Sequence, residues 1–422
     1  MSSQPLRIAF FLNQFPVLSE TFILDQMTGL IDRGHELDIY ARGPGAGTPS
    51  HAEVDQYGLL ARTRYHGMPV NRGRRVAAAC RLLATRFRHR PRVALRALNP
   101  ARYGLEAASL ARLFWHAALV DQPPYDVVHG HFGPNGRLAC QLREAGVLRG
   151  AVATTFYGYD LTQVPHQRGR AHYRDLFENS DLLLPISGFF RNKLLELGCP
   201  PEKIAVHHLG IDCSKFHYQA RRHDPTAPIR LLSLARLVEK KGLEYAIRAV
   251  AKVAHEFPRI RYRIVGDGPL RRKLEQLIAQ LAVGTQIELA GWRSRAEILA
   301  ELARADLVLA PSVTAADGDQ EGTPVALMEA MATGLPVLST WHSGIPELVE
   351  DGVSGALVPE RDADALAAKL RELLCNPSRW PEMGRRGRAT VEQHFHIGRL
   401  NDQLVELYRG ISLARTAPAR RT

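Results

Sequence analysis

Short apolar runs alternate with helical patterns along most of the chain. In the first half, these runs lie at residues 8–12, 36–41, 126–129, 152–156 and 181–186. In the second half, they lie at residues 229–235, 261–265, 286–289, 306–310, 336–340 and 355–358. Continuous apolar runs of this length are typical of strands buried on both faces of a parallel sheet. Because helical patterns separate them, the chain is predicted to be an α/β protein with helices covering parallel sheets.

A polar segment, residues 210–228, separates the two series of strands; it contains two prolines and has no clear periodicity. We interpret it as the linker between two doubly wound, Rossmann-like domains, residues 1–210 and 211–396. A last helix, at about residues 397–413, lies beyond the final strand and could pack back onto the first domain. Two such domains facing one another place a ligand site in the cleft between them, at the carboxyl ends of the strands.

The composition is that of an ordinary globular protein. Of the 422 residues, 45% are hydrophobic and 23% are charged, which excludes a disordered or fibrous chain. The five cysteines form neither a CxxC pair nor a metal-ligand spacing, which argues against a disulfide framework. No segment reaches the roughly 20 apolar residues of a membrane span, and the N-terminal apolar run is too short for a signal peptide. These features predict a cytoplasmic protein.

The net charge of +12 originates in one part of the chain. Residues 56–105 hold twelve arginines and no acidic residue, and the remainder has 43 basic and 43 acidic residues. Within the basic stretch 62–102, one helical face would carry Val76, Ala79, Cys80, Leu83 and Phe87. An amphipathic basic helix of this kind suits an anionic membrane surface, and a core-packed helix with a solvated charged face is the alternative. Nucleic-acid binding is not expected, because few aromatic side chains are available to stack on bases.

The segment EGTPVALMEAMATGLP, residues 321–336, has the features of an anion site. Thr323 is a typical helix N-cap and Pro324 fits the first helical position, so a short helix is expected up to residue 333. Free backbone N–H groups in its first turn would face the cleft, and they belong to Val325, Ala326 and Leu327.

Two carboxylates frame this helix start. Glu321 lies in the loop before the helix, next to Gly322, and Glu329 lies about 7–8 Å beyond Pro324 along the helix. One carboxylate can therefore lie near a phosphate while the other accepts hydrogen bonds from vicinal hydroxyls of a sugar. Taken alone, the pattern also fits a capped, solvent-facing helix with two surface glutamates.

Two further segments of the second domain carry candidate ligand-binding groups. Arg236 follows the strand 229–235 and Lys241 lies in the loop after it, so both can reach the cleft and hold two phosphates. In VGDGPL, Gly266 flanks Asp267 and would permit close approach of a ligand to the backbone. A nicotinamide site is not expected, because the segment lacks the GxGxxG spacing. The alternatives are a solvated basic loop and an ordinary tight turn.

In this order and spacing, these segments resemble the donor half of the retaining family 4 glycosyltransferases, which have the two-domain GT-B fold. Glu321 and Glu329 match the E-x7-E pair of that family, and Arg236 and Lys241 match its diphosphate-binding residues. The blocks FPVLSETFI, DGDQEGTPVALMEAMATG and HSGIPELVE are similar to bacterial exopolysaccharide transferases of the colanic-acid type. The resemblance covers nearly the whole chain. It implies that Glu321 contacts hydroxyls of the transferred sugar, Glu329 the nucleotide ribose, and the two basic residues the diphosphate.

The first domain contributes candidates of its own. His131, in VVHGHFGPNG, matches a histidine that lies near the sugar and leaving phosphate in the resembling enzymes, and His129 is expected to be packed. In TTFYGYD, Tyr157 stands where the resemblance leads us to expect a histidine; its hydroxyl could still donate a hydrogen bond to acceptor or phosphate. Asp160 is a further candidate on this side. Ser19, with the helix N-terminus behind it, could contact the leaving phosphate.

The resemblance implies transfer of a hexose, with retained anomeric configuration, from a nucleotide sugar, most commonly a UDP-sugar. The implied acceptor is a lipid-linked saccharide in exopolysaccharide biosynthesis, which suits peripheral attachment to the inner face of the cell membrane. No cofactor and no metal are expected, because basic residues and helix amides would stabilise the leaving diphosphate. The triplet Asp317-Gly318-Asp319 leaves a metal site as the lesser alternative. A GT-B-fold sugar-nucleotide epimerase and a non-catalytic nucleotide-sugar-binding subunit remain alternative functions.

Overall fold

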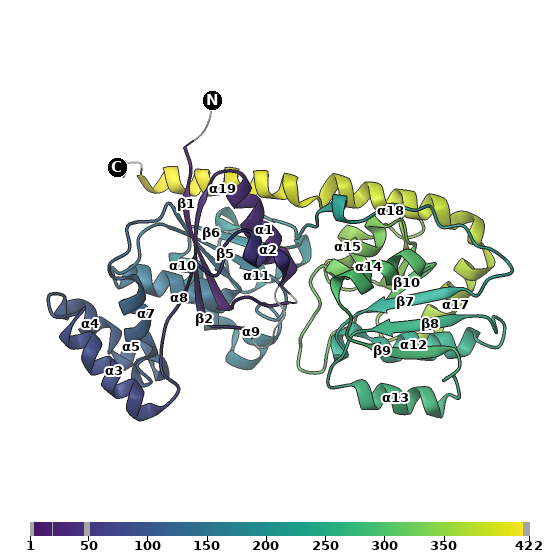
Figure 1. The fold of residues 1–422 in the computed structure, drawn as a ribbon, viewed down its shortest axis with the longest axis horizontal. Coiled ribbons are helices and arrows are strands. Elements are labelled where there is room, and N and C mark those ends of the chain that lie inside the picture. The colour runs from purple at the N-terminus through teal and green to yellow at the C-terminus, as the bar shows by residue number, and fades with distance from the viewer. Residues whose placement is uncertain (1–3, 19, 46–50, 417–422) are drawn as a thin grey trace.

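The computed structural model describes residues 4–18, 20–45 and 51–416. Two α/β units lie side by side, and the last two helices run along one edge of both (Figure 1). Each unit is built on a six-stranded sheet in which every pairing is parallel. The predicted α/β architecture with two doubly wound sheets is confirmed. Among the described residues, no helix combines the length and the apolar character needed to cross a bilayer.

The first sheet has the strand order β3-β2-β1-β4-β5-β6. Its strands are β1 (Arg7–Gln14), β2 (Glu36–Gly43), β3 (Thr63–Tyr65), β4 (Val127–His131), β5 (Ala151–Phe156) and β6 (Leu182–Pro185). The chain order reverses between β1 and β4, so the loops that follow these two strands diverge and leave a crevice. The edge strand β3 is absent from the sequence-based prediction, because its three residues carry no apolar run.

Helices cover both faces of this sheet. They are α1 (Thr21–Asp32), α2 (Ala52–Gln56), α3 (Arg72–Ala84), α4 (Pro91–Ala97), α5 (Pro100–Tyr103), α6 (Leu105–Ala108), α7 (Ala111–Leu119), α8 (Gly133–Glu144), α9 (Gln163–Arg168), α10 (Arg174–Asn179) and α11 (Gly188–Glu196). Helix α1 begins with Glu20 at its N-cap position. Ser19, the predicted cap and phosphate contact, lies outside the described residues.

The basic stretch forms a protrusion made of α3 and α4 at one end of the molecule (Figure 1). It packs on α7 through a small apolar cluster to which Ala79 and Phe87 contribute. Val76 and Cys80, predicted on the same face, are exposed. The predicted apolar face is therefore divided: part of it packs as a core helix, and part of it remains at the surface among the arginines.

The second sheet has the strand order β12-β11-β10-β7-β8-β9. Its strands are β7 (Arg230–Leu234), β8 (Arg261–Val265), β9 (Ile287–Gly291), β10 (Leu307–Ala310), β11 (Val337–Thr340) and β12 (Ala356–Val358). Its helices are α12 (Leu243–Val253), α13 (Arg271–Gln280), α14 (Arg295–Arg304), α15 (Val325–Ala332), α16 (Ile345–Leu348), α17 (Ala363–Cys375) and α18 (Trp380–His394). Short 3-10 turns are η1 (Arg170–Tyr173), η2 (Pro201–Lys203), η3 (Cys213–Lys215), η4 (Glu239–Lys241) and η5 (Pro377–Arg379). The strand order of the second sheet reverses between β7 and β10, which opens a second crevice.

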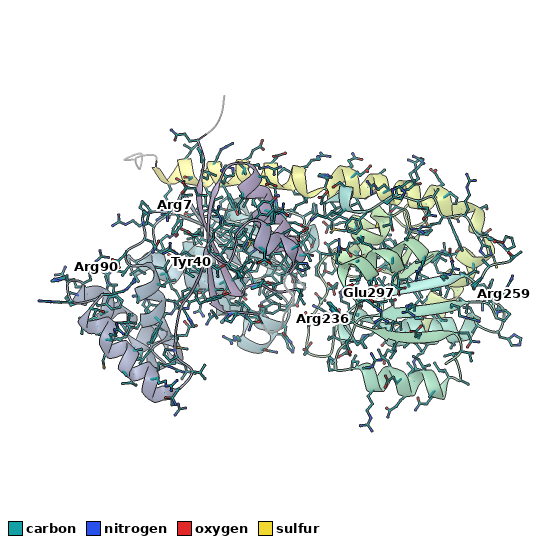
Figure 2. The ribbon with its side chains drawn as sticks, in the orientation of Figure 1. Arg7, Tyr40, Arg90, Arg236, Arg259 and Glu297 are labelled. Carbon is teal, nitrogen blue, oxygen red and sulfur yellow. The ribbon has the colours of Figure 1, made fainter. Side chains whose placement is uncertain are left out.

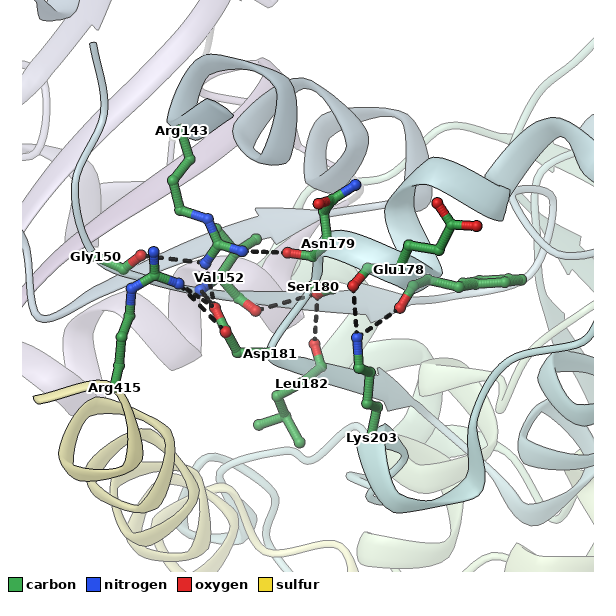
Figure 3. Close-up of polar contacts among 11 residues, drawn as sticks. Arg143, Gly150, Val152, Glu178, Asn179, Ser180, Asp181, Leu182, Lys203 and Arg415 are labelled. Atoms are coloured by element: carbon green, nitrogen blue, oxygen red, sulfur yellow. Dashed lines mark hydrogen bonds and ion pairs between the residues drawn. The ribbon is translucent and has the colours of Figure 1, made fainter. Parts of the chain in front are cut away.

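Helix α19 (Ile397–Thr416) follows the second unit but packs on the first. Leu404, Val405 and Tyr408 belong to the apolar core of the first sheet. The hydroxyl of Tyr408 lies 2.5 Å from Nδ1 of His129, which is packed as expected. Near the other end of α19, Arg415 lies 3.4 Å from the carboxylate of Asp181, which Arg143 also contacts (Figure 3).

Polar contacts also join the two units across the cleft. The carboxylate of Glu347, on α16, accepts hydrogen bonds from the N–H groups of Gly188 at 2.9 Å and Phe189 at 3.1 Å, at the start of α11. On another side, Nε2 of Gln163 donates to Asp317 at 2.6 Å. These contacts hold the carboxyl ends of the two sheets toward each other.

Candidate active site between the two domains

A cavity of about 400 Å³ lies between the two units and is lined by both. From the first unit it receives Glu20, Phe22, Phe132, Tyr157, Gly158, Tyr159, Ile186 and Leu209. From the second unit it receives Leu234, Ala235, Arg236, Lys240, Lys241, Glu321, Gly322, Thr323, Val325 and Ala326. The second group comes from the loops after β7 and β10, the two strands between which the sheet order reverses. This is the position at which open α/β sheets bind ligands.

Helix α15 presents its N-terminus to this cavity. It begins at Val325, one residue later than predicted, because Pro324 is extended with φ −66° and ψ 117° and occupies the N-cap position in place of Thr323. Val325 and Ala326 line the cavity, and their N–H groups have no hydrogen-bond partner among the described residues. Leu327 differs from the prediction: its side chain is buried and its N–H donates to the carbonyl of Pro324 at 3.0 Å. Two free amides thus remain for an anion.

Glu321 and Lys241 form an ion pair in the cavity, with 2.5 Å between Nζ and Oε2. Burial alone would raise the pKa of Glu321, but the ammonium groups of Lys241 and Lys240 outweigh it and hold this pKa at about 2. Glu321 is therefore ionised at neutral pH and accepts hydrogen bonds only. Lys240 is itself 3.0 Å from Asp319, so the loop before α15 is held by two lysines.

His342 fixes the backbone of Glu321 from behind. Its Nε2 accepts a hydrogen bond from the N–H of Glu321 at 3.0 Å, and its Nδ1 lies 2.6 Å from Glu360. Glu360 in turn accepts from the N–H of Thr314 at 2.7 Å. An imidazole that accepts at Nε2 must carry its proton at Nδ1, so the Glu360 carboxylate selects the tautomer that orients Glu321. Sequence reasoning missed this role, although His342 opens the HSGIPELVE block.

Arg236 lies at the junction of the two units (Figure 2) and is exposed toward the cavity. Gly266, predicted to let a ligand approach, instead lets the loops approach each other: at φ 137°, a Cβ there would collide with the carbonyl of Ala235. Asp267 does not line the cavity either, and accepts from the N–H of Gly268 at 2.7 Å. This glycine loop therefore supports the strand end that carries Arg236.

Glu329 lies on α15 behind the cavity wall and is not one of its lining residues. Its carboxylate is buried and pairs with Arg295 at 2.5 Å. Burial raises the pKa of Glu329, and the guanidinium of Arg295 acts against this rise. Arg295 also lies over the ring of Phe216, with 4.9 Å between the guanidinium carbon and the ring centre. A ribose that binds Glu329 must share this carboxylate with Arg295.

His131 does not reach the cavity surface, which differs from the prediction. Its side chain is fully buried, and its Nδ1 lies 2.6 Å from the hydroxyl of Tyr157, which does line the cavity. Burial lowers the pKa of His131 to about 3, so the imidazole is neutral. His129 stacks on it at 4.2 Å between ring centres. In this arrangement, His131 can act on a ligand only through Tyr157.

Asp160 is also fully buried, in contrast to its predicted place at the acceptor side. It accepts hydrogen bonds from three backbone N–H groups, those of Gly133, Tyr157 and Gly158, at 2.9–3.0 Å. Burial raises its pKa to about 6 against the effect of these bonds. Its carboxylate joins the loop after β5 to the start of α8, and so positions Tyr157.

Two residues that sequence reasoning did not select face the cavity from the first unit. Glu20 lines it, and burial raises the pKa of Glu20 to about 7. Tyr159 also lines it, beside Phe132. Glu20 lies in the FPVLSETFI block and Tyr159 in TTFYGYD, but only the fold shows that both residues line the cavity.

The Asp317-Gly318-Asp319 triplet is engaged by protein groups. Asp319 pairs with Lys240 at 3.0 Å, and Asp317 accepts from Gln163 at 2.6 Å and from the N–H of Asp319. In the part of the chain that the structure describes, no three histidine, cysteine, aspartate or glutamate side chains converge as metal ligands would.

Two parallel doubly wound sheets with a shared cleft, and basic residues and helix amides in that cleft, define the class of GT-B glycosyltransferases. Residues 217–390 match the family model described as glycosyl transferases group 1, and residues 19–215 match glycosyltransferase family 4. WcaL of Salmonella typhimurium, whose name assigns it provisionally to colanic acid biosynthesis, is 44% identical over 96% of this chain and 100% of its own length. The amylovoran biosynthesis glycosyltransferase AmsK of Erwinia amylovora is 41% identical over 95% of this chain and 99% of its own. This chain belongs to the family 4 glycosyltransferases.

Solved structures agree with this fold. Anabaena HepE, crystallised in complex with UDP, superposes with a TM-score of 0.69 at 18% sequence identity, over 96% of this chain and 100% of HepE. Sucrose-phosphate synthase from Thermosynechococcus elongatus gives a TM-score of 0.70, also at 18% identity, over 97% of this chain and 100% of its own. The GT-B architecture inferred from the sequence is confirmed.

Proposed function

We propose that this enzyme transfers a hexose from a UDP-sugar to a lipid-linked saccharide in exopolysaccharide biosynthesis, with retention of the anomeric configuration. The observation that carries the proposal is the grouping of Arg236, Lys241 and the free amides of Val325 and Ala326 around one cavity. This grouping suits a diphosphate, and Glu321 beside it suits the hydroxyls of a sugar. The second domain then holds the donor, and the first domain holds the acceptor.

The charges of the cleft support a reaction that depends on leaving-group stabilisation. The two basic side chains and the α15 amides can stabilise the negative charge that develops on the departing diphosphate, without a metal. Glu321 is held by Lys241 at 2.5 Å, which suits a role in positioning the sugar rather than attack on it. In the proposed step, the acceptor oxygen bonds to the anomeric carbon on the face from which the diphosphate leaves. The proton of the acceptor hydroxyl passes to a phosphate oxygen.

Calorimetric titration of the full chain with UDP, GDP and UDP-glucose, with and without EDTA, tests the donor site. We expect UDP to bind, unaffected by EDTA, and Glu329→Gln to weaken it by about 10-fold or more, because a charged acceptor for the ribose hydroxyls is lost. Glu382→Gln, at an exposed glutamate of the same domain, is the matched control. Binding of GDP without binding of UDP would show that the donor carries guanine instead of uracil. Binding of no nucleotide would contradict the proposed function.

The α3–α4 protrusion supports peripheral attachment to an anionic membrane. Val76 and Leu95 are exposed there, at 55% and 70%, and Val70, just before α3, is exposed at 92%, although apolar side chains of this size are usually buried. Exposed arginines without an ion pair among the described residues lie on the same two helices and in the turn between them, and they include Arg74, Arg81, Arg88 and Arg92. Exposed apolar groups within a basic surface are the combination that binds the headgroup region of an anionic bilayer.

Flotation with phosphatidylglycerol-containing vesicles tests this attachment. The triple variant Arg74→Gln, Arg88→Gln, Arg92→Gln is expected to partition about 100-fold less strongly, since each arginine near the surface contributes about 1 kcal/mol. The wild-type protein should also be released by added salt. The control removes three exposed arginines of the second domain, Arg248, Arg272 and Arg304. Equal flotation of the two triple variants would contradict the membrane role of the protrusion.

A further inference from the structure

A second cavity, of about 690 Å³, lies within the first domain. Asn13 at the end of β1, Arg42 at the end of β2, and Pro134 and Asn135 after β4 contribute to its wall. It therefore occupies the crevice between β1 and β4, where the order of the first sheet reverses. This is the first domain's counterpart of the donor position in the second domain. Tyr159 lines both cavities, so the two adjoin.

Arginine dominates the lining of this second cavity. Five guanidinium groups reach it from five segments of the fold, namely those of Arg42, Arg102, Arg112, Arg137 and Arg168. Among the described residues, one acidic side chain lines it, that of Glu106. Guanidinium groups that converge from separate elements on one hollow form an electrostatic site rather than a solvated surface.

The carboxylates around this cavity do not balance its arginines. Glu106 forms ion pairs with two of them, Arg112 at 2.7 Å and Arg42 at 3.7 Å. Arg137 pairs with Asp175 at 2.8 Å, and Arg102 pairs with Glu144. Arg168 has no ion pair within the ranges that the structure describes. Three carboxylates thus face five guanidinium groups, which leaves two positive charges unmatched.

Arg112 is a buried member of this group with an unpaired hydrogen-bond donor. Only 5% of its side chain is exposed, and its Nη1 is buried with no hydrogen-bond partner in the described part of the chain. It lies over the ring of Tyr103, with 4.7 Å between the guanidinium carbon and the ring centre. A buried cation with an unused donor is costly unless an acceptor completes its hydrogen bonds. Its place in the cavity wall indicates that the missing acceptor is a ligand.

The positive charges of this cavity also affect His172. It lines the cavity beside Arg137 and Arg168, and its pKa is lowered by burial and then by the charges of these two residues. The imidazole is therefore neutral at physiological pH and can donate one further hydrogen bond to an anion.

We propose that this arginine-lined cavity binds a diphosphate group on the acceptor. A diphosphate linked at both ends carries two negative charges, which match the two unmatched guanidinium groups; a single carboxylate on an acidic sugar carries one. Forked guanidinium groups also suit the oxygens of adjacent phosphates. The acceptor saccharide then extends past Tyr159 to the donor cavity. This inference rests on the proposed function, and it adds a separate site for the charged part of the acceptor.

Calorimetric titration with inorganic pyrophosphate tests the site in a Lys241→Met background, which weakens anion binding in the donor cavity. Adding Arg42→Gln and Arg168→Gln, both at the wall of the second cavity, is expected to weaken pyrophosphate binding by at least about 10-fold. The control adds Arg248→Gln and Arg272→Gln, exposed in the second domain, and should leave pyrophosphate affinity unchanged. Titration with glucuronate provides the comparison between ligand classes.

The outcomes separate the two proposals. Equal pyrophosphate affinity in the two arginine variants, or tighter binding of glucuronate than of pyrophosphate, would overturn the diphosphate site. Absence of nucleotide binding to the wild-type chain would instead contradict the proposed function, and the comparison of the arginine variants would still report on the first domain. Arg42→Gln with Arg168→Gln, in the otherwise wild-type chain, should leave UDP affinity within twofold of its original value, because the donor groups belong to the other domain.

Discussion

Replacing Lys241 by methionine is expected to lower the rate of sugar transfer by about 10²–10³-fold, the usual effect of removing one group that stabilises developing charge. The ammonium group lies 2.5 Å from Glu321 in the interdomain cavity, so the variant loses a charge for the diphosphate and the partner of a partly buried carboxylate. The measurement is kcat/KM for transfer to an acceptor extract, with Lys252→Met as the control. Lys252 pairs with Asp364 on the surface of the same domain. Unchanged transfer would remove Lys241 from the catalytic machinery.

The same substitution is expected to change the pH dependence. In the native protein the lysines hold the pKa of Glu321 at about 2, below its ordinary value of 4.5. This lowered pKa contributes stability above pH 4.5, and the contribution is lost as the pH falls from 4.5 toward 2. Without Lys241, less positive charge opposes the effect of burial, so the pKa of Glu321 rises and the acid limb of the rate profile moves to higher pH. An acid limb at the same pH in both proteins would contradict this assignment.

Gly322→Ala is expected to lower transfer by about 10²-fold, the size of effect that follows from an ångström-scale misplacement of substrates. A Cβ at Gly322 would collide with the carbonyl oxygen of Tyr157 and lie 2.6 Å from Cδ1 of Ile186, both across the cleft. Because a backbone atom cannot give way as a flexible side chain does, the domains must move apart. Nucleotide affinity should change little, since the proposed donor groups stay in place within the second domain.

Gly284 provides a control for the Gly322→Ala variant. An alanine Cβ at Gly284, in the same domain, would meet no neighbouring side chain or backbone within 4 Å, so Gly284→Ala should leave transfer unchanged. Small-angle X-ray scattering should detect a larger radius of gyration for Gly322→Ala than for Gly284→Ala. Full transfer activity in Gly322→Ala would show that the close approach of the domains is not needed for the reaction.

Most of the fold follows from the hydrophobic pattern, because strands buried on both faces leave continuous apolar runs. The ends of the strands differ from the predicted ends by one or two residues where polar residues continue a strand beyond its apolar run, as Asn13 and Gln14 do in β1. The edge strand β3 could not be predicted in this way. Its residues are Thr-Arg-Tyr, and its pairing with β2 depends on a neighbour that the fold supplies.

The candidate site was predictable where one local segment forms it, and less so where distant segments meet. The start of α15 and the position of Lys241 follow from neighbouring residues, but Arg295 reaches Glu329 from 34 residues earlier in the chain. The prediction that His129 is packed while His131 reaches the site was wrong for a different reason. Alternate residues of a strand lie on the same face, so a packed His129 already places His131 beside it, where the two rings stack.

The path of α19 has a consequence for the order in which the enzyme matures during synthesis. Leu404 and Tyr408 complete the apolar core of the first sheet, yet the ribosome makes them after the entire second domain. Vectorial folding normally allows an N-terminal domain to close before the next emerges. Here the nascent first domain keeps an unfilled face until residues 397–416 are made. Completion of the first domain's core therefore depends on synthesis of the whole second domain.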